Sequence, residues 1–386
     1  MTSPPGRLEG LRVVIVLKWA GLGGAERQAL MLARRLVEVE GAEVEVRALN
    51  DADGRARELF GEVGIRWVAR RGRWRGSSSR TFARLVRTAV FLRAARPDVL
   101  LPYCEVPNVV CGLVWRYTGA RTCVWNQRDR LPFTLGERTA GRALRGTPVI
   151  LSNSEHGAQF IAAHRAPRDR IRVIHNGVGL PPAAATRTEW RRALDVDESG
   201  LVVSSLSHFY AHKDHETLLE AWQRALARAD GNRSSLTLVL AGRPEGRRGV
   251  LDALARDLGV ADRVRFVGDV EDVAGLLQAS DLSVLSSPAE GCPNAVLESM
   301  EAGLPVVGTD VPGIRDALGE DQREFLAPIG DADALAAALS RLCEDGALRR
   351  AVGEHNAERQ RAIYGSERML EQTVNAIVGG LEASRT

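Results

Sequence analysis

Two glutamates flank a short turn in the second half of the chain. Residues 282–303 read LSVLSSPAEGCPNAVLESMEAG, with Glu290 directly before the turn Gly-Cys-Pro-Asn and Glu298 in the apolar segment after it. A strand, a turn and a helix are expected in that order, with Asn294 as the N-cap of the helix. Backbone N–H groups near 294–296 would then be open to a phosphate.

The two carboxylates suit different parts of a ligand that carries phosphate. A carboxylate beside a phosphate is unfavourable unless it accepts hydrogen bonds, and the vicinal hydroxyls of a ribose are the usual donors. Glu298, on the first turn of the helix, fits that role, whereas Glu290 would meet a group beyond the phosphates. A single glutamate in such a place is more often a solvated surface residue, but the strand, turn and helix around this pair favour a binding site.

Lysine is rare in this chain. Arginine supplies 50 of the 52 basic residues, and the only lysines are Lys18 and Lys213. Chance is enough to explain Lys18, whereas Lys213 indicates a site that prefers a compact ammonium to a planar guanidinium. The spacing of His208, His212 and His215 suits zinc ligands on one helix face. A lysine among them, in a segment that reads as a loop entering a helix, opposes a metal ion, so no metal site is expected.

The elements that position these residues alternate between strand and helix. Such a pattern predicts a parallel sheet with helices on both faces, and it restarts after a linker that contains Pro181-Pro182. The sequence therefore predicts an α/β fold with two doubly wound, Rossmann-like domains. Apolar strands are expected at 11–17, 43–49, 98–104, 121–126 and 147–154, and then at 201–207, 236–242, 264–268, 282–287 and 304–309.

The length also predicts two domains, because 386 residues exceed what one hydrophobic core usually supports. We expect an acceptor-side domain at 1–178 and a nucleotide-binding domain at 179–364, with the last helix, about 365–386, packed on the first. Ligands of such folds bind at the carboxyl ends of the strands. The two domains are therefore expected to face a central cleft.

Charge is divided unequally along the chain. Residues 1–180 hold 30 Lys+Arg against 16 Asp+Glu, whereas residues 181–386 hold 22 against 33. A basic first half attracts an anionic partner, which is a phosphorylated acceptor, an acidic membrane surface or a nucleic acid. The arginines and tryptophans of 66–87 suit either a solvated surface segment or a patch that contacts the acceptor or an anionic membrane. Nucleic acid is not expected, because no recognition fold accompanies the charge.

The cysteines and the apolar runs indicate the compartment. The five cysteines form no C-x-x-C pair and are odd in number, which suits a reducing environment. No apolar run reaches the length of a signal-peptide core or a membrane span. The expected location is the cytoplasm, with peripheral contact at the inner face of the membrane.

Three segments resemble a known family. EGCPNAVLESMEAGLPVV (290–307) is similar to the signature of the retaining glycosyltransferases of family 4, which have the GT-B architecture, and LGGAERQALMLARRL (22–36) and LSHFYAHKDHETLLEAW (206–222) are similar to two further motifs of that family. The resemblance implies transfer of a sugar from a UDP or GDP sugar to a sugar, lipid-linked or small-molecule acceptor. Polysaccharide, glycolipid or glycoconjugate biosynthesis would use that reaction, without a cofactor and without an obligatory metal.

The resemblance also implies roles for single residues. Glu290 contacts the transferred sugar, Glu298 the ribose and Lys213 the diphosphate, with His208 at a position where the family commonly has arginine. Relatives often carry a histidine near the acceptor, and this chain has none there. The remaining donor-binding residues are then Gly291, Asn294, Ala295, Val296, Gly23, Gly24 and Gly268, and the candidates for the acceptor side are Glu105, Asn126, Arg128 and Asp129.

Three other classes of protein fit part of the pattern. The segment AGLGGAE, followed by an acid at Asp51, suits a nicotinamide-dependent oxidoreductase, although its glycines do not match G-x-G-x-x-G. A nucleotide-sugar epimerase of the same architecture would show the same motifs. A lectin-like or membrane-adaptor protein would keep the fold without catalysis. Donor hydrolysis or transfer separates the glycosyltransferase from each of these.

Overall fold

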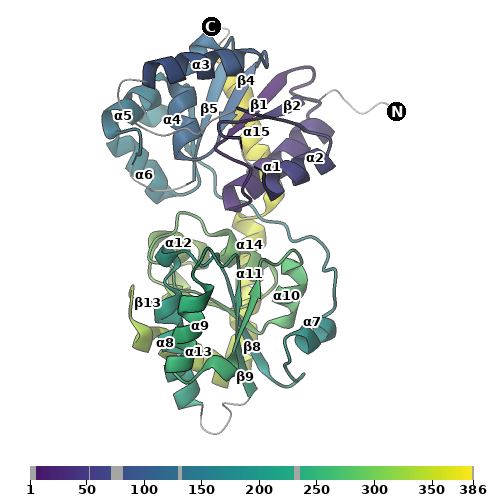
Figure 1. The fold of residues 1–386 in the computed structure, drawn as a ribbon, viewed down its shortest axis with the longest axis vertical. Helices are drawn as coiled ribbons and strands as arrows, with labels where there is room; N and C mark the ends of the chain where they lie inside the picture. The colour runs from purple at the N-terminus through teal and green to yellow at the C-terminus, as the bar shows by residue number, and fades with distance from the viewer. Residues whose placement is uncertain (1–5, 52, 71–80, 129–132, 230–234, 385–386) are drawn as a thin grey trace. The chain divides into compact units, whose positions relative to one another are not determined.

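The structure, a computed structural model, describes residues 6–51, 53–70, 81–128, 133–229 and 235–384. The chain forms two compact units (Figure 1). The first unit consists of Met1–Asn176 together with Glu367–Thr386, and the second of Gly177–Ser366. The chain therefore leaves the first unit once and returns to it with its last helix.

The first unit contains a parallel sheet with the strand order β3-β2-β1-β4-β5-β6-β7. The sequence analysis missed β3 and β7, which are short, only partly buried strands at the two edges of this sheet. The strands are β1 (Arg12–Leu17), β2 (Glu43–Ala48), β3 (Arg66–Ala69), β4 (Val99–Pro102), β5 (Thr122–Gln127), β6 (Val149–Ser152) and β7 (Ile171–Val173).

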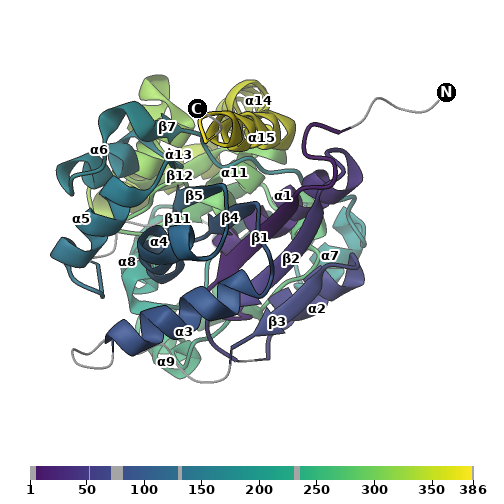
Figure 2. The same ribbon diagram turned by 90° about the horizontal axis from the view of Figure 1, so that it is seen from above.

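Alternate residues of the central strands bury opposite faces of this sheet. Ile15 packs with α1 and the C-terminal helix α15, whereas Val14 and Val16 pack with α3 and α4. Figure 2 shows α3 beside α4 on one side of the sheet. The helices are α1 (Gly24–Glu38), α2 (Arg55–Glu62), α3 (Thr81–Arg93), α4 (Glu105–Val114), α5 (Glu137–Gly146), α6 (Glu155–Ala163) and α15 (Ser366–Glu382).

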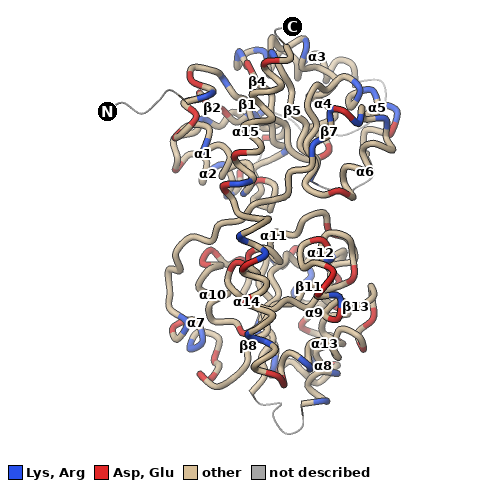
Figure 3. Tube along the Cα trace, turned by 180° about the vertical axis from the view of Figure 1, so that it is seen from behind, with Lys and Arg blue, Asp and Glu red and all other residues tan. Residues whose placement is uncertain are grey.

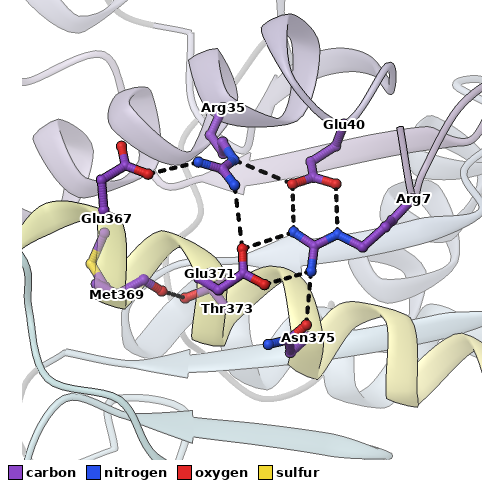
Figure 4. Close-up of polar contacts among 8 residues, drawn as sticks. All are labelled: Arg7, Arg35, Glu40, Glu367, Met369, Glu371, Thr373 and Asn375. Carbon is purple, nitrogen blue, oxygen red and sulfur yellow. Dashed lines mark hydrogen bonds and ion pairs between the residues drawn. The ribbon is translucent and has the colours of Figure 1, made fainter. Parts of the chain in front are cut away.

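An ion-pair network ties α15 to the N-terminal part of the first unit (Figure 4). The guanidinium of Arg7 contacts Glu40 at 2.6 Å and Glu371 at 2.7 Å, and that of Arg35 contacts Glu40 at 3.2 Å and Glu367 at 2.7 Å. The Glu40 side chain is only 3% exposed. Hydrogen bonds from Arg7 and then from Arg35 outweigh this burial and lower the pKa of Glu40.

The second unit contains another parallel sheet, with the strand order β10-β9-β8-β11-β12-β13. β13, the strand that the sequence analysis did not predict here, again lies at an edge. The strands are β8 (Leu201–Leu206), β9 (Leu236–Ala241), β10 (Val264–Gly268), β11 (Leu282–Leu285), β12 (Val306–Thr309) and β13 (Leu326–Ala327).

Helices cover both faces of the second sheet. Val203 packs with α8, α9 and α13, and Val202 packs with α7 and α10 on the opposite face. The helices are α7 (Arg187–Ala193), α8 (His215–Arg228), α9 (Arg248–Asp257), α10 (Val273–Ala279), α11 (Asn294–Glu301), α12 (Pro312–Leu318), α13 (Ala332–Glu344) and α14 (Gly346–Ile363).

Both units confirm the predicted doubly wound α/β fold. The strand order reverses between β1 and β4 in the first sheet and between β8 and β11 in the second. Ligands of open parallel sheets bind at the carboxyl ends of the strands at such a reversal. In the part of the chain that the structure describes, no helix has the length and apolar character needed to cross a membrane.

Candidate functional site

Lys213 and Glu290 meet at the strand reversal of the second unit. Lys213 lies in the segment that follows β8, and Glu290 lies in the segment that follows the neighbouring strand β11. The Nζ atom of Lys213 forms an ion pair with Oε1 of Glu290, and the two side chains are 21% and 12% exposed. The structure thus brings together two of the three residues predicted to be catalytic.

The backbone around Lys213 is held by a serine at the end of β11. A single 3₁₀ turn, Ala211–Lys213, precedes α8, and Asp214 adopts a left-handed conformation with φ of 51° as the N-cap of that helix. The Ser286 hydroxyl lies 3.1 Å from the carbonyl oxygen of Lys213 and 2.8 Å from that of Asp214. Sequence reasoning missed Ser286, because the predicted strand 282–287 contains it, whereas β11 ends at Leu285.

A glycine packs directly behind Glu290. A Cβ atom on Gly313, in α12, would lie 2.5 Å from the carbonyl oxygen of Glu290 and 2.7 Å from that of Gly291. Any side chain at Gly313 would therefore displace the turn. The turn is also supported by the Ser287 carbonyl, which accepts a hydrogen bond from the Thr309 hydroxyl.

The helix after the turn differs from the prediction in two details. Helix α11 begins at Asn294, and Pro293 occupies the N-cap position without a side-chain cap, so Asn294 is not the N-cap. The Val296 N–H donates to the Pro293 carbonyl at 3.1 Å, so this amide is not open as expected. Such 3₁₀-type bonds are common in the first turn of a helix. Glu298 and the residues Gly291, Asn294 and Ala295 are partly exposed.

His208 lies beside an arginine that sequence reasoning missed. The Nδ1 atom of His208 accepts a hydrogen bond of 3.1 Å from the backbone N–H of Arg243, and the Arg243 guanidinium lies 3.1 Å from Nε2. This edge therefore carries an arginine after all, supplied from the end of β9. The preceding Gly242 is essential to that approach, because a Cβ there would lie 2.1 Å from the Ser207 carbonyl oxygen. The Gly268 carbonyl accepts a 2.7 Å hydrogen bond from Gly242.

The two other histidines of the predicted triplet point to different partners. His212 stacks on Tyr210 at 5.3 Å between ring centroids, and His215 is hydrogen-bonded to the Ser207 hydroxyl at 2.9 Å. Burial lowers the pKa of His215 to about 4. Within the described ranges, no group of three or more His, Cys, Asp or Glu side chains is arranged to hold a metal ion.

The glycine loop of the first unit forms the start of α1. Gly24 is the first residue of the helix, and Gly23 is its N-cap. The Gly23 N–H donates to the Glu26 carboxylate at 3.0 Å, which is a partner that the sequence analysis did not foresee. A ligand that uses this amide therefore has to replace Glu26.

The acceptor-side candidates lie at the carboxyl ends of β4 and β5 in the first unit. Glu105 is buried and accepts hydrogen bonds from the backbone and the hydroxyl of Thr134, at 2.8 and 2.7 Å. Asn126 is fully buried, and Arg128 donates to Asn176. Asp129 lies outside the described residues. Asn176, three residues after the end of β7, was not predicted as a site residue, because β7 itself was not predicted.

Two family models match the chain. The model described as Glycosyltransferase Family 4 matches residues 22–180, and the model described as Glycosyl transferases group 1 matches residues 199–345. Among curated proteins, the lipopolysaccharide core biosynthesis glycosyltransferase LpsE of Rhizobium meliloti (strain 1021) is 30% identical over 338 residues, which cover 87% of this chain and 90% of that protein.

Two further relatives are matched over about half of their length. The D-inositol 3-phosphate glycosyltransferase of Acidothermus cellulolyticus is 31% identical over 55% of this chain and 49% of its own. The N-acetyl-alpha-D-glucosaminyl L-malate synthase of Bacillus anthracis is 29% identical over 48% of this chain and 47% of its own.

Solved structures show the same fold over nearly the whole chain. Anabaena Alr3699/HepE in complex with UDP and glucose has a TM-score of 0.81 and 19% identity, covering 96% of this chain and 100% of its own. WaaG, a glycosyltransferase involved in lipopolysaccharide biosynthesis, has a TM-score of 0.70 and 18% identity, covering 95% of this chain and 100% of its own. Because both identities are low, these likenesses concern the fold.

Proposed function

The chain belongs to the group 1 glycosyltransferase family and has the GT-B fold, and we propose that it transfers a sugar from a nucleotide-diphosphate sugar to an acceptor hydroxyl with retention at the anomeric carbon. The observation that carries the proposal is the meeting of Lys213 and Glu290 at the strand reversal of the second unit. Both side chains are largely buried there, and Glu290 lies four residues before the first residue of α11.

The proposed reaction breaks the bond between the anomeric carbon and the leaving diphosphate oxygen. The acceptor oxygen forms the new bond on the same face, and its proton passes to the leaving diphosphate. Negative charge grows on that diphosphate, so the Lys213 ammonium stabilises the transition state more than the ground state. The first amides of α11 and the positive end of its dipole act in the same direction. No obligatory metal is needed in this scheme.

The two glutamates are proposed to bind different parts of the donor. Glu290 is proposed to receive the sugar hydroxyls once the diphosphate draws Lys213 away from it, and Glu298 to accept hydrogen bonds from the ribose. Arg243, beside His208, adds a guanidinium for the diphosphate at the position where this chain lacks the usual arginine. His208 is then a residue that positions Arg243 and not the main phosphate ligand.

The donor is proposed to be a UDP or GDP sugar. UDP is supported by HepE, the structural neighbour solved with UDP and glucose. The acceptor is proposed to be a sugar, a lipid-linked sugar or a small molecule, in polysaccharide, glycolipid or glycoconjugate biosynthesis. This range includes what the relatives' names say they act on, namely lipopolysaccharide core, inositol 3-phosphate and malate. None of those relatives is named as an epimerase or an oxidoreductase.

The proposed location is the cytoplasmic face of an anionic membrane. Phe82, Val86 and Val90 lie four residues apart on α3 and are 78%, 47% and 64% exposed, which places an apolar stripe on one face of the helix. Helix α3 has three arginines and no acidic residue, and Figure 3 shows basic residues along α3 and α5. Apolar side chains beside arginines suit the interface of anionic lipid. Trp74 and the rest of residues 71–80 lie outside the described residues.

Incubation of the protein with UDP and GDP sugars tests the proposed function. We expect release of the nucleotide diphosphate from one donor, faster in the presence of an acceptor, and an α-linked product from an α-linked donor by NMR. A β-linked product would overturn retention. If no nucleotide sugar binds or turns over, and Lys213→Met and Glu290→Gln change nothing, the assignment of a glycosyltransferase site to these residues is wrong.

A further inference from the structure

Among the described residues, the groups that contact Arg128 of the first unit are neutral. It directly follows β5, and its Nη1 atom donates a hydrogen bond to the Asn176 side-chain oxygen. Its Nη2 atom lies 3.5 Å from the Asn126 side-chain oxygen, and its guanidinium carbon lies 5.4 Å from the ring centroid of Tyr103. Within the described ranges, no carboxylate forms an ion pair with Arg128.

Three other arginines that are partly or fully buried each pair with a carboxylate. Arg35 pairs with Glu40 at 3.2 Å, Arg191 pairs with Asp281 at 3.3 Å, and Arg47 pairs with Glu45. A guanidinium that is partly removed from water is normally paired with an anion, because the loss of hydration is otherwise not compensated. Arg128 is partly buried, and no described carboxylate pairs with it.

The neighbouring tyrosine does not supply the missing charge. Tyr103 is 1% exposed, and burial raises the pKa of its hydroxyl to about 12 although Arg128 acts in the opposite direction. The phenol is therefore neutral near neutral pH. Its ring contributes a cation–π contact that orients the guanidinium without cancelling its charge.

The amide that faces Arg128 is also fixed in orientation. The Asn126 side-chain N–H groups donate to the carbonyls of Pro102 and Val124, both at 3.1 Å. Its oxygen is thereby left to face Arg128. The backbone of Asn126 is locked by Asn108, which donates to its carbonyl at 2.6 Å and accepts from its N–H at 3.0 Å. The guanidinium is thus preorganised, and only two of its five N–H groups are used in these contacts.

We infer that Arg128 receives an anionic group of the acceptor, a phosphate or a carboxylate, at the carboxyl edge of the first sheet. The inference rests on the proposed function, because it adds a chemical class to the proposed acceptor. A planar guanidinium held from one side presents its remaining N–H groups as a fork, and that fork matches two oxygens of a carboxylate or phosphate. Carboxyl ends of parallel strands are also where ligands of this fold class bind.

Calorimetric titration with inorganic phosphate, glycerol phosphate and malate tests this site. The titrations use the full chain with Lys213→Met, which weakens phosphate binding at the proposed donor site, and they are repeated with saturating UDP on the unchanged chain. We expect Arg128→Gln to weaken binding of at least one probe by about tenfold or more. Arg128→Lys keeps the charge but loses the fork, and it should give an intermediate loss. Tighter binding of glycerol phosphate or of malate decides between the two anions.

Arg142→Gln is the matched control, because Arg142 is an exposed arginine of α5 in the same unit. It removes the same charge and should leave binding of all three probes unchanged. Equal affinity in Arg128→Gln and in the parent chain, with melting temperatures that match, would overturn the inference. The proposed function is tested separately by UDP-sugar turnover, so a chain that binds phosphate through Arg128 but turns over no nucleotide sugar would refute only the latter.

Discussion

Lys213 and Glu290 lie 77 residues apart in the sequence, yet their side chains form an ion pair at the carboxyl ends of two adjacent strands. In this state the ammonium proposed for the diphosphate is neutralised by the carboxylate proposed for the sugar. Donor binding then exchanges one ionic partner of Lys213 for another. The exchange lowers the apparent affinity for a bare nucleotide, because the ion pair has to be broken first.

Glu290→Gln should therefore have opposite effects on nucleotide binding and on turnover. Loss of the ion pair frees Lys213, and we expect UDP or GDP to bind at least about threefold more tightly. Loss of the sugar contact should lower kcat by about a hundredfold. Calorimetry with the nucleotide diphosphate and steady-state turnover of the donor sugar measure the two effects. Weaker nucleotide binding in Glu290→Gln would contradict the proposed exchange.

Gly313→Ala should disrupt the turn that carries Glu290. The added methyl would lie 2.5 Å from the Glu290 carbonyl oxygen, a contact that only a backbone shift relieves. We expect weaker donor binding and a loss of stability of about 2 kcal/mol, measured by calorimetry and urea unfolding. Gly249→Ala in α9 is the control, because its added methyl would meet no described atom within 4 Å beyond its chain neighbours and the helix's own backbone. That change should leave both quantities unaltered or raise stability slightly.

The network around Glu40 should make the first unit sensitive to acid. Arg7 and Arg35 lower the pKa of Glu40, so the stability it contributes is present above the pKa of an unfolded glutamate. That stability is lost as the pH falls through the depressed folded value. Glu40→Gln should lower stability at pH 7 by about 2 kcal/mol and flatten its decline below pH 5. Scanning calorimetry across this range measures both, and a variant whose decline is as steep as the parent's would contradict the prediction.

His215 should add a second acid sensitivity in a different range. Its folded pKa is lowered to about 4 by burial, whereas an unfolded histidine titrates near 6.5. The unfolded chain therefore binds more protons between these values, and folding stability falls as the pH drops from about 6.5 to 4. The decline due to this group is at most about 3 kcal/mol. His215→Asn should remove this decline. Urea unfolding at several pH values between about 6.5 and 4 measures it, and a free energy of unfolding that falls as steeply with pH in the variant as in the parent would refute the assignment.

The apolar stripe of α3 should bind anionic vesicles. We expect Phe82→Ser combined with Val90→Ser to abolish sedimentation of the protein with vesicles that contain phosphatidylglycerol, and Arg87→Gln to weaken it and reduce its salt dependence. Vesicles of phosphatidylcholine alone should bind little. The control is Val250→Ser combined with Ile329→Ser, two exposed apolar residues of the second unit. Equal binding by both double variants, or a change in oligomeric state instead of vesicle binding, would count against a membrane surface.

The strands that sequence reasoning missed all lie at sheet edges, although one edge strand, β10, was predicted. Long apolar runs such as 12–17 and 236–241 are buried strands with neighbours on both sides, so burial on both faces leaves a continuous apolar signal. The three missed strands, β3, β7 and β13, all lie at sheet edges. Edge strands are short and partly exposed, which removes the pattern on which a prediction depends.

The residues of the candidate site that could be predicted are those that the sequence alone makes conspicuous. Lys213 stood out because lysine is rare here, and Glu290 because of the turn after it. Ser286, Gly313 and Arg243 gave no such signal, since their importance lies in contacts with residues far away in the sequence. The helix boundary at Asn294 was missed by one residue, which is the usual uncertainty of helix ends.

The return of α15 to the first unit also constrains the order in which the two units can complete their folding. All strands and helices of the second unit lie between Gly177 and Ser366, so that unit is available for folding while the chain is still being synthesised. The core beneath α1 lacks Leu370, Val374 and Ile377 until the last helix has emerged. The unit that starts first is therefore completed after the second, because Arg7 and Arg35 can meet their glutamate partners only once α15 has been synthesised.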